Sequence, residues 1–259
     1  MTRRVRTVAV TQSDPFFTGR FFETFLPRAR AGGVEILEIV VLPNFNESRL
    51  ALLRRVAGLY PPTDLIRLAA RYVCSGLETR RGIPRGVEAV AAVNGVPTRT
   101  LASINDAAYL ATLPGRDVDV LLSVAAPQIL RREALAAAPL TLNVHNGRLP
   151  DYRGMMPTFW ALLEGEEHVV VTLHEMAEQL DAGTVVAEFE VPVAPGESAF
   201  DVSRNAKAVA GREIAGLLSK VGSEQWPAGR PIDVSSGRYH GFPSRRDARR
   251  LRRAGRRML

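Results

Sequence analysis

Runs of apolar residues alternate with amphipathic segments along this chain, and their lengths predict a mixed α/β fold. Residues 7–11 and 34–42 are apolar and rich in β-branched side chains, whereas residues 15–30 between them have helical periodicity. Five later segments are also expected to be strands, at residues 96–101, 119–124, 140–144, 169–174 and 184–193. Strands that alternate with helices predict a Rossmann-like, doubly wound and mostly parallel sheet.

Helices are expected between the later strands and in one inserted region. The segments with helical periodicity are residues 105–113, 128–137 and 158–164. Residues 43–82 also have a helical pattern and interrupt the order of strands. This insertion fits a lid, the surface of a homodimer or ordinary packing.

The simplest organisation is one domain over residues 1–195, followed by a helical C-terminal extension over residues 196–259. No internal repeat divides the first part. The first strand leads into T-Q-S-D-P-F-F-T-G-R, which lacks the glycine pattern of dinucleotide-binding folds. A nicotinamide or flavin cofactor is therefore not expected.

Hydropathy and cysteine content favour a cytoplasmic protein without membrane contact. No apolar run reaches the roughly 18–20 residues that span a bilayer. The basic N-terminus precedes a short apolar stretch that soon ends at Gln12, which favours a first strand over a signal peptide. The single cysteine, Cys74, lies in an apolar helical pattern and is expected to be a buried, unreactive thiol.

The net charge of +7 is confined to the C-terminal end. Residues 245–259 hold eight arginines and one aspartate, and the remaining 244 residues carry 26 basic and 26 acidic groups. A neutral body argues against a broad nucleic-acid footprint.

The arginine-rich end itself is expected to form a helix. Ser244 and Asp247 have the spacing of a helix cap. Four residues then fall on one helical face, namely Ala248, Leu251, Gly255 and Met258. A helix docked on the body with its arginines in solvent is favoured, and dimer contacts or the binding of an acidic ligand remain alternatives.

Two polar side chains stand where the strand at residues 140–144 ends. Asn143 and His145 are two residues apart, so on a strand both point to the same side. Ligands bind at the carboxyl ends of parallel strands, where loops converge. The pair therefore fits a binding or catalytic site, and it also fits a polar strand end that caps a neighbouring loop.

Four motifs occur around this pair: N-V-H at residues 143–145, L-P-D-Y-R-G at 149–154, T-L-H-E-M at 172–176 and L-D-A-G at 180–183. Their order and spacing resemble the folate-dependent formyltransferase family. That family includes glycinamide ribonucleotide formyltransferase, methionyl-tRNA formyltransferase and the nucleotide-sugar N-formyltransferases. The resemblance extends upstream through residues 104–130.

The resemblance implies that Asn143, His145 and Asp181 are catalytic and that N10-formyltetrahydrofolate is the co-substrate. An amine that attacks the formyl carbon creates an oxyanion, which an amide and a protonated imidazole can stabilise. Asp181 would orient His145 and accept the proton that the amine loses. This chemistry needs no metal, and the sequence has no cluster at metal-ligand spacing.

The resemblance also implies a folate-binding segment. Its main-chain groups would contact the pterin at Pro127, Gln128, Ile129 and Leu130, and the loop that contains Gln179 would close over it. Ile129 and Leu130 fit equally well as the first residues of a helix packed in the core.

Four further residues are expected to contact the amine substrate, namely Arg148, Tyr152, Arg153 and His174. Arg148 follows the Asn143/His145 motif and could bind an anionic substrate group, or it could be a solvated loop charge. His174 fits a structural strand histidine as well as a substrate contact.

The favoured acceptor is a small-molecule amine, above all an amino-sugar nucleotide. Glycinamide ribonucleotide enzymes have a glycine-rich phosphate loop that T-Q-S-D-P-F-F-T-G-R replaces here. Residues 196–259 are too few and too helical for the β-barrel of methionyl-tRNA enzymes, and formyltetrahydrofolate hydrolases usually carry an N-terminal regulatory domain. These activities remain alternatives, as does an inactive formyltransferase-like module that binds nucleic acid through its basic end.

Overall fold

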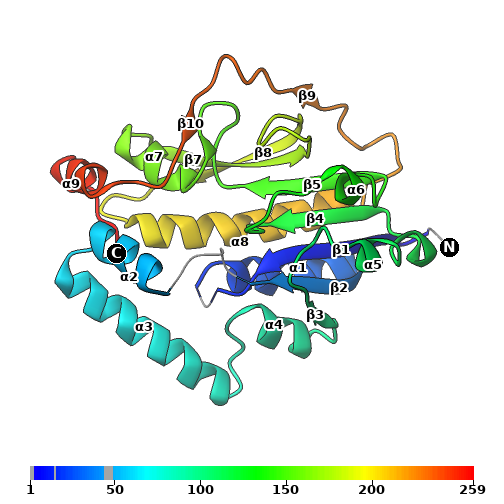
Figure 1. Ribbon diagram of the computed structural model, residues 1–259, viewed down its shortest axis with the longest axis horizontal. Coiled ribbons are helices and arrows are strands. Elements are labelled where there is room, and N and C mark those ends of the chain that lie inside the picture. The colour runs from blue at the N-terminus through cyan, green and yellow to red at the C-terminus, as the bar shows by residue number, and fades with distance from the viewer. Residues whose placement is uncertain (1–2, 15, 44–48) are drawn as a thin grey trace.

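The computed structural model describes residues 3–14, 16–43 and 49–259, without the side chains of residues 49–53 and 80 (Figure 1). Its centre is an eight-stranded sheet in the order β3-β2-β1-β4-β5-β7-β8-β9. The parallel strands are β1 (Val5–Gln12), β2 (Val34–Leu42), β3 (Thr98–Thr100), β4 (Val120–Val124) and β5 (Leu140–His145). The antiparallel strands are β7 (His168–Glu175), β8 (Thr184–Pro192) and β9 (Arg230–Pro231). The predicted mostly parallel α/β sheet is confirmed.

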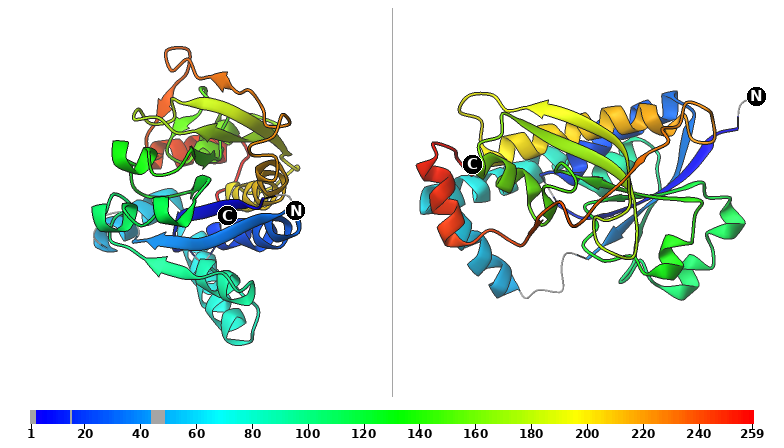
Figure 2. Two further views of the ribbon diagram at one scale, coloured as in Figure 1. Left: turned by 90° about the vertical axis from the view of Figure 1, so that its right-hand side faces the viewer. Right: turned by 90° about the horizontal axis from the view of Figure 1, so that it is seen from above.

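Helices cover both faces of this sheet (Figure 2, left). One face shares a core with α1 (Thr18–Ala31), α4 (Val87–Val93), α7 (Pro157–Leu163) and α8 (Ala199–Leu218). The other face packs on α5 (Ala107–Leu110) and α6 (Arg132–Leu135). Strands buried on both faces are apolar throughout, because alternate side chains enter opposite cores.

The order of the strands positions a ligand site. From β1 the chain moves outward to β2 and β3, and it later returns to β4 and β5 on the other side of β1. The strand order therefore reverses between β1 and β4. At such a reversal the loops after the strands diverge and leave a crevice, here beyond Gln12, Val124 and His145.

Two expected helices are much shorter than their sequence pattern. The segment 128–137 forms only the four-residue α6, and 105–113 forms the four-residue α5 before a 3-10 turn at Pro114–Arg116. Asn105 explains the first difference, because its side chain donates to the carbonyl of Ile129 at 2.9 Å and accepts from the amide of Arg131 at 2.7 Å. These bonds hold the chain after β4 as a loop.

The aromatic residues of α1 are core residues, whereas Phe17, just before the helix, is not. Phe21, Phe22 and Phe25 are fully buried, as their spacing predicts. Phe17 is half-buried and lines a cavity. α1 begins at Thr18, and the expected helical residue Pro15 lies outside the described residues.

The insertion forms α2 (Arg49–Leu59) and α3 (Pro62–Arg80), and its residues 44–48 lie outside the described part. In Figure 1, α3 runs along the lower edge of the molecule. Its side chains Ile66, Tyr72 and Val73 are largely exposed. The prediction of a buried Cys74 is wrong, since this thiol is exposed. Helical periodicity identifies an apolar face but does not reveal whether another element covers it.

The C-terminal part begins with a helix that shares the core of the preceding residues. α8 packs against α1 within one core, and the boundary expected at residue 195 stays a prediction. After α8 the chain forms β9 and β10 (Tyr239–His240), which pairs with β6 (Arg153–Gly154). The expected helical character is therefore limited to α8 and α9 (Arg245–Arg253).

The arginine-rich helix α9 docks on the body, as its sequence pattern predicts. Ser244 and Asp247 form a capping box at its start. Ala248 and Leu251 are fully buried in the core, whereas the arginines of the helix are exposed. Gly255, expected on the same face, is exposed because α9 ends at Arg253. α9 lies beside α2, at the end of the molecule opposite the N-terminus (Figures 1 and 2).

The docking of α9 predicts a large stability effect at its central contact. Leu251→Ala should lower the free energy of unfolding by about 2–4 kcal/mol, because it leaves a cavity in the core. The exposed neighbour Arg249 provides the control, and Arg249→Ala should change stability by less than about 0.5 kcal/mol. Urea denaturation followed by circular dichroism measures both. Equal effects would show that the helix does not contribute to the folded core.

Candidate active site

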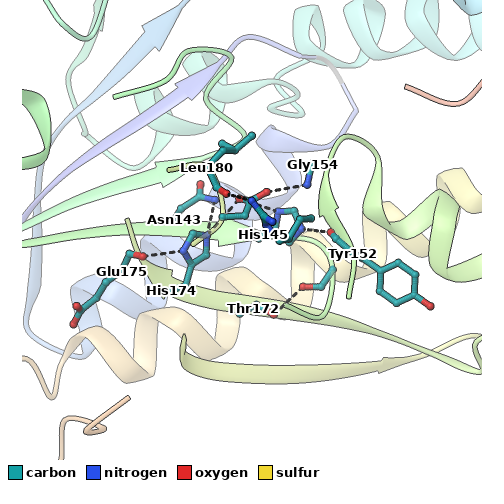
Figure 3. Close-up of polar contacts among 11 residues, drawn as sticks. Asn143, His145, Tyr152, Gly154, Thr172, His174, Glu175 and Leu180 are labelled. Atoms are coloured by element: carbon teal, nitrogen blue, oxygen red, sulfur yellow. Dashed lines mark hydrogen bonds and ion pairs between the residues drawn. The ribbon is translucent and has the colours of Figure 1, made fainter. Parts of the chain in front are cut away.

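Asn143 is held by the neighbouring antiparallel strand. The register of β5 and β7 pairs Asn143 with His174, and the Asn143 Nδ2 lies 3.1 Å from the His174 Nε2 (Figure 3). The other ring nitrogen of His174 lies 2.9 Å from the carbonyl oxygen of Glu175. A carbonyl can only accept, so His174 donates from Nδ1 and accepts at Nε2 from the Asn143 amide. The orientation of the Asn143 side chain follows from these two bonds.

The environment of His174 keeps this arrangement in place. Burial, together with the nearby charge of His145, lowers the pKa of His174 well below its ordinary value. His174 is therefore uncharged at neutral pH, and its Nε2 remains an acceptor. The structure supports the interpretation of His174 as a positioning residue.

His145 is fixed in one orientation by the loop that follows it. Its Nε2 donates to the carbonyl of Tyr152 at 2.7 Å. The Nδ1 then faces the Asp181 Oδ1 at 3.7 Å, and both side chains are buried. This separation exceeds a direct hydrogen bond and leaves Nδ1 available for another partner.

Asp181 stands in a strained loop that directs its carboxylate at the two histidines. Its φ of 53° lies in the left-handed region, which is uncommon for a non-glycine residue. The Oδ2 accepts from the amide of Gly154 at 2.8 Å, and the Oδ1 lies 3.8 Å from the His174 Nε2. Only glycine fits at position 183, because a Cβ there would overlap the carbonyl oxygen of Glu175. The L-D-A-G motif therefore sets where the carboxylate lies.

The structure thus brings Asn143, His145 and Asp181 together at the carboxyl end of β5. All three line a cavity of about 610 Å³. A smaller cavity of about 80 Å³ lies beside it, and Asn143 and Asp181 line both. The polar cluster therefore stands at the border of two neighbouring spaces, which is the arrangement that a transfer between two bound molecules requires.

The segment expected to bind the pterin lines these spaces. Pro127, Gln128 and Ile129 line the larger cavity, and Leu130 lines the smaller one although it is also buried in the core. Ile129 is 63% exposed, so it is not the core residue that a helix start would make it. Gln128 uses its side chain to hold the chain at residues 102 and 104.

Four of the residues expected to contact a ligand lie away from the two cavities. Arg148 is exposed and pairs with Glu190 at 3.5 Å. The Tyr152 hydroxyl donates to Glu166, and its ring points away from His145 (Figure 3). These two residues, Arg153 and Gln179 line neither cavity. The loop after β5 turns back over β7 and β8, which carries the side chains of its motif away from the site.

Arg153 bonds to the loop that precedes Asp181. Its guanidinium donates to the carbonyl of Leu180 at 2.8 Å, next to Asp181 in the chain. Gln179 is exposed, whereas Leu180 lines both cavities. In this loop it is therefore Leu180, and not the expected Gln179, that borders the cavities.

Sequence reasoning also missed a group of cavity residues far from the motifs. They are Asp14, Phe17, Tyr60, Phe200, Ser203 and Lys207. Their only sequence signal was the helical spacing of Phe200, Ser203 and Lys207, which places them on one face of α8. Nothing local indicates that this face borders a cavity.

Among the described residues, no group of three or more histidine, cysteine, aspartate or glutamate side chains is arranged to hold a metal ion. In the same part of the chain, no helix has the length and apolar character needed to cross a membrane.

Solved structures share this fold at low sequence identity. A sugar N-formyltransferase from Shewanella sp. FDAARGOS_354 has a TM-score of 0.57 at 15% identity, covering 92% of this chain and 76% of that one. An N-formyltransferase from Helicobacter canadensis, solved with folinic acid and dTDP-3-aminofucose, has a TM-score of 0.58 at 14% identity, with coverage of 92% and 71%. Glycinamide ribonucleotide transformylase 1 from Symbiobacterium toebii has a TM-score of 0.58 at 18% identity, with coverage of 90% and 96%.

Sequence comparison identifies the same family. The methionyl-tRNA formyltransferase of Rhodopirellula baltica is 34% identical over 156 residues, which are 58% of this chain and 47% of that protein. This chain therefore spans about half the length of that relative. The profile of the family described as formyl transferase matches residues 16–217. The chain belongs to the formyl transferase family, as its four motifs predicted.

Proposed function

We propose that this protein transfers a formyl group from N10-formyltetrahydrofolate to a primary amine on a small molecule, with an amino-sugar nucleotide as the favoured acceptor. One observation carries the proposal: Asn143, His145 and Asp181 lie together on the wall of the larger cavity, and Asn143 and Asp181 also line the smaller one. An amide, an imidazole and a carboxylate are the groups that acyl transfer between two nitrogens needs.

Each side chain has a role that follows from its contacts. When bound, the folate supplies the formyl group. The Asn143 amide, oriented by His174, donates an N–H to the negative charge that develops on the formyl oxygen as the amine nitrogen adds to the carbon. His145 donates from Nδ1 to the same charge when protonated, because its Nε2 is engaged with Tyr152.

In this proposal Asp181 accepts the proton that the amine loses and returns one to the folate nitrogen. The amine loses one proton as its bond to the formyl carbon forms, and the folate nitrogen gains one as its bond to that carbon breaks. The Asp181 Oδ1 faces the cluster while Oδ2 is held by Gly154, so one oxygen is free to accept and return a proton. The net transfer needs no other acid or base.

The residues after β4 fit a flat, partly apolar ligand. Ile129 is an exposed apolar residue that lines both cavities, and Leu180, in the loop before Asp181, lines both as well. Exposed apolar side chains beside a cavity are typical of ligand sites. We therefore assign Pro127, Gln128, Ile129 and Leu130 to the pterin.

The larger cavity supports a nucleotide-linked acceptor. Its volume of about 610 Å³ is in the range of small-molecule sites. The rings of Phe17, Tyr60 and Phe200 line it, and aromatic rings stack on nucleobases.

The start of α1 argues against glycinamide ribonucleotide. A helix N-terminus binds phosphate through its free amides. Here the Asp14 carboxylate already accepts from the amides of Phe16, Phe17 and Thr18 at 2.8, 2.6 and 2.9 Å. A phosphate at this position would have to displace a built-in carboxylate.

Methionyl-tRNA is the second candidate acceptor. The relative at 34% identity is a methionyl-tRNA formyltransferase, and the exposed arginines of α9 could contact phosphates. A tRNA acceptor predicts activity that falls steeply with salt, and a small acceptor predicts a weak dependence.

A screen of acceptors tests the proposal. The protein is incubated with N10-formyltetrahydrofolate and, separately, amino-sugar nucleotides, glycinamide ribonucleotide, methionyl-tRNA or no amine. Mass spectrometry then detects the added formyl group, and a formate assay detects hydrolysis. We expect a formylated amino-sugar nucleotide. Formate release that needs no amine, or formyl transfer to methionyl-tRNA alone, would overturn the proposal.

His174 is expected to influence turnover through Asn143. His174→Ala should lower kcat about tenfold with little change in KM, because the Asn143 amide loses the bond that orients it. His174→Gln should recover part of the loss, since its side-chain oxygen can accept from the amide. Steady-state kinetics measures both variants, and a glutamine variant as slow as the alanine variant would contradict a positioning role.

A further inference from the structure

A further cavity lies outside the candidate active site, where the insertion meets the body. Its volume is about 280 Å³, and its wall includes Arg71 and Ser75 of α3 and Arg204 of α8. We call it the α3 cavity. Of the described residues that line it, Phe200 alone also lines the larger cavity, and none lines the smaller one. The α3 cavity is therefore a separate space.

Two ion pairs on the wall of the α3 cavity are complete in themselves. Arg20 donates to the Glu23 carboxylate at 2.7 Å, and Arg85 donates to the Glu78 carboxylate at 2.8 Å. Each pair is neutral as a whole, so neither provides a net charge for a ligand. A ligand site has to be sought among the other polar residues of this wall.

The remaining charges on the wall are two guanidinium groups and one carboxylate. Asp201 lies 3.8 Å from the Arg71 guanidinium, which exceeds a hydrogen bond, and its other oxygen accepts from the Ser198 hydroxyl at 2.6 Å. Arg71 also lies over the ring of Phe200, at 4.6 Å. Arg204 is half-buried and forms neither a hydrogen bond nor an ion pair with any described residue. One positive charge is left over, and both guanidinium groups keep unused donors.

Ser75 adds a buried hydroxyl to the same wall. The residue is 9% exposed and lines the α3 cavity. A buried helical hydroxyl often donates to the carbonyl one turn earlier, as Thr79 does to the carbonyl of Ser75 at 3.0 Å. The Ser75 hydroxyl itself has no hydrogen bond with any described residue. A buried hydroxyl without a partner costs stability unless a ligand or water satisfies it.

Helix geometry brings these polar groups together. Arg71 and Ser75 are four residues apart on α3, and Asp201 and Arg204 are three residues apart on α8, so each pair shares one helix face. The contact between Arg71 and Asp201 joins the two faces at the α3 cavity. Two guanidinium groups and one hydroxyl thus border the same small space.

We propose that the α3 cavity is a second ligand site, which binds a small molecule through an oxyanion group held by Arg71, Arg204 and Ser75. Phosphate and carboxylate share this chemistry. Phosphate is the first expectation, because its oxygens can accept from all three groups at once. The bound oxyanion balances the charge that is left over and gives the buried hydroxyl a partner. This site is independent of the formyl acceptor and of formyl transfer.

Isothermal titration calorimetry on the full chain tests the site without any turnover. The probes are inorganic phosphate and malonate, at constant ionic strength, because the arginines of α9 attract any anion at low salt. The wild type is compared with Arg204→Gln and Ser75→Ala. Arg249→Gln, which removes an exposed arginine of α9, is the matched control. Circular dichroism verifies that each variant is folded.

We expect the wild type and Arg249→Gln to bind a probe with the same Kd. Arg204→Gln should weaken this binding about 10- to 100-fold, and Ser75→Ala about threefold to tenfold. Binding of phosphate but not malonate identifies a phosphate group, the reverse identifies a carboxylate, and equal binding shows that any oxyanion fits. Failure of both probes to bind overturns the proposal. An unchanged Kd in Arg204→Gln or Ser75→Ala, or an equal loss in Arg249→Gln, also overturns it.

The thiol of Cys74 shows whether the probe binds in this cavity. Cys74 is the single cysteine of the chain, is exposed and lines the α3 cavity. A bound oxyanion should slow its alkylation by iodoacetamide, a neutral reagent, roughly threefold or more, because it blocks approach and disfavours the reactive thiolate. The same probe concentration should not slow alkylation in Arg204→Gln. An alkylation rate that a saturating probe leaves unchanged in the wild type would place the anion elsewhere and refute the site.

Discussion

Asp181→Asn is expected to lower kcat about 10³-fold, which is the largest single effect in the site. Asparagine has the same shape and can still accept from the Gly154 amide, so the loop should keep its conformation. It cannot accept the proton that leaves the amine, and the charge beside His145 and His174 is lost. Single-turnover measurements with saturating folate and acceptor give the rate of the chemical step directly.

The control for this substitution is a carboxylate outside the cavities. Asp151 is exposed on the loop after β5, and Asp151→Asn should change kcat less than about twofold. Circular dichroism and thermal unfolding should show both variants folded. If Asp181→Asn retained more than a tenth of the wild-type rate, Asp181 would not be the base, and the proton route proposed here would be wrong.

Asn143→Ala is expected to lower kcat by about 10²–10³-fold and to change KM little. The amide acts on charge that exists only during the reaction, so its removal affects the transition state more than the bound substrates. His174 should then have no amide to orient. Steady-state kinetics on the folded variant measures the effect, with Asn205→Ala, an exposed amide of α8, as the matched control.

A double-mutant cycle strengthens this test. If His174 acts only through Asn143, the variant with both residues replaced by alanine should be no slower than Asn143→Ala alone. Independent, multiplicative losses would show that His174 contacts the reacting groups itself. A rise in KM for one substrate with unchanged kcat in Asn143→Ala would instead assign Asn143 to substrate binding.

Much of the fold was predictable because its signals are local. The strands at 34–42 and 140–144 have buried, β-branched patterns that hold wherever the chain places them, and the expected strand ends agree closely with β2 and β5. The capping box of α9 depends on two residues three positions apart. The helix expected at 128–137 failed because a side chain from residue 105 competes for its main-chain groups.

The residues of the site likewise divide into those with a local sequence signal and those without one. Asn143 and His145 were predictable as a pair because strand geometry places residues two apart on one side. Asp181 could be added through the motif that contains it, and its left-handed backbone and the close approach at Gly183 show why that motif exists. Arg148, which lies between two motifs, and Tyr152, which lies within one, bond to Glu190 and Glu166 and line neither cavity, and no local pattern reveals these partners.

The order of residues was therefore enough to establish an α/β sheet, a docked basic helix and the types of group that carry the chemistry. Periodicity and spacing report on neighbours within a few residues, and these features depend on such neighbours. The exposure of Cys74, the cavity face of α8 and the burial of Lys207 depend on segments that meet only after folding. Electrostatic interactions between residues as far apart in the chain as 14 and 207 leave no local trace in a sequence, because either residue would look the same without the other.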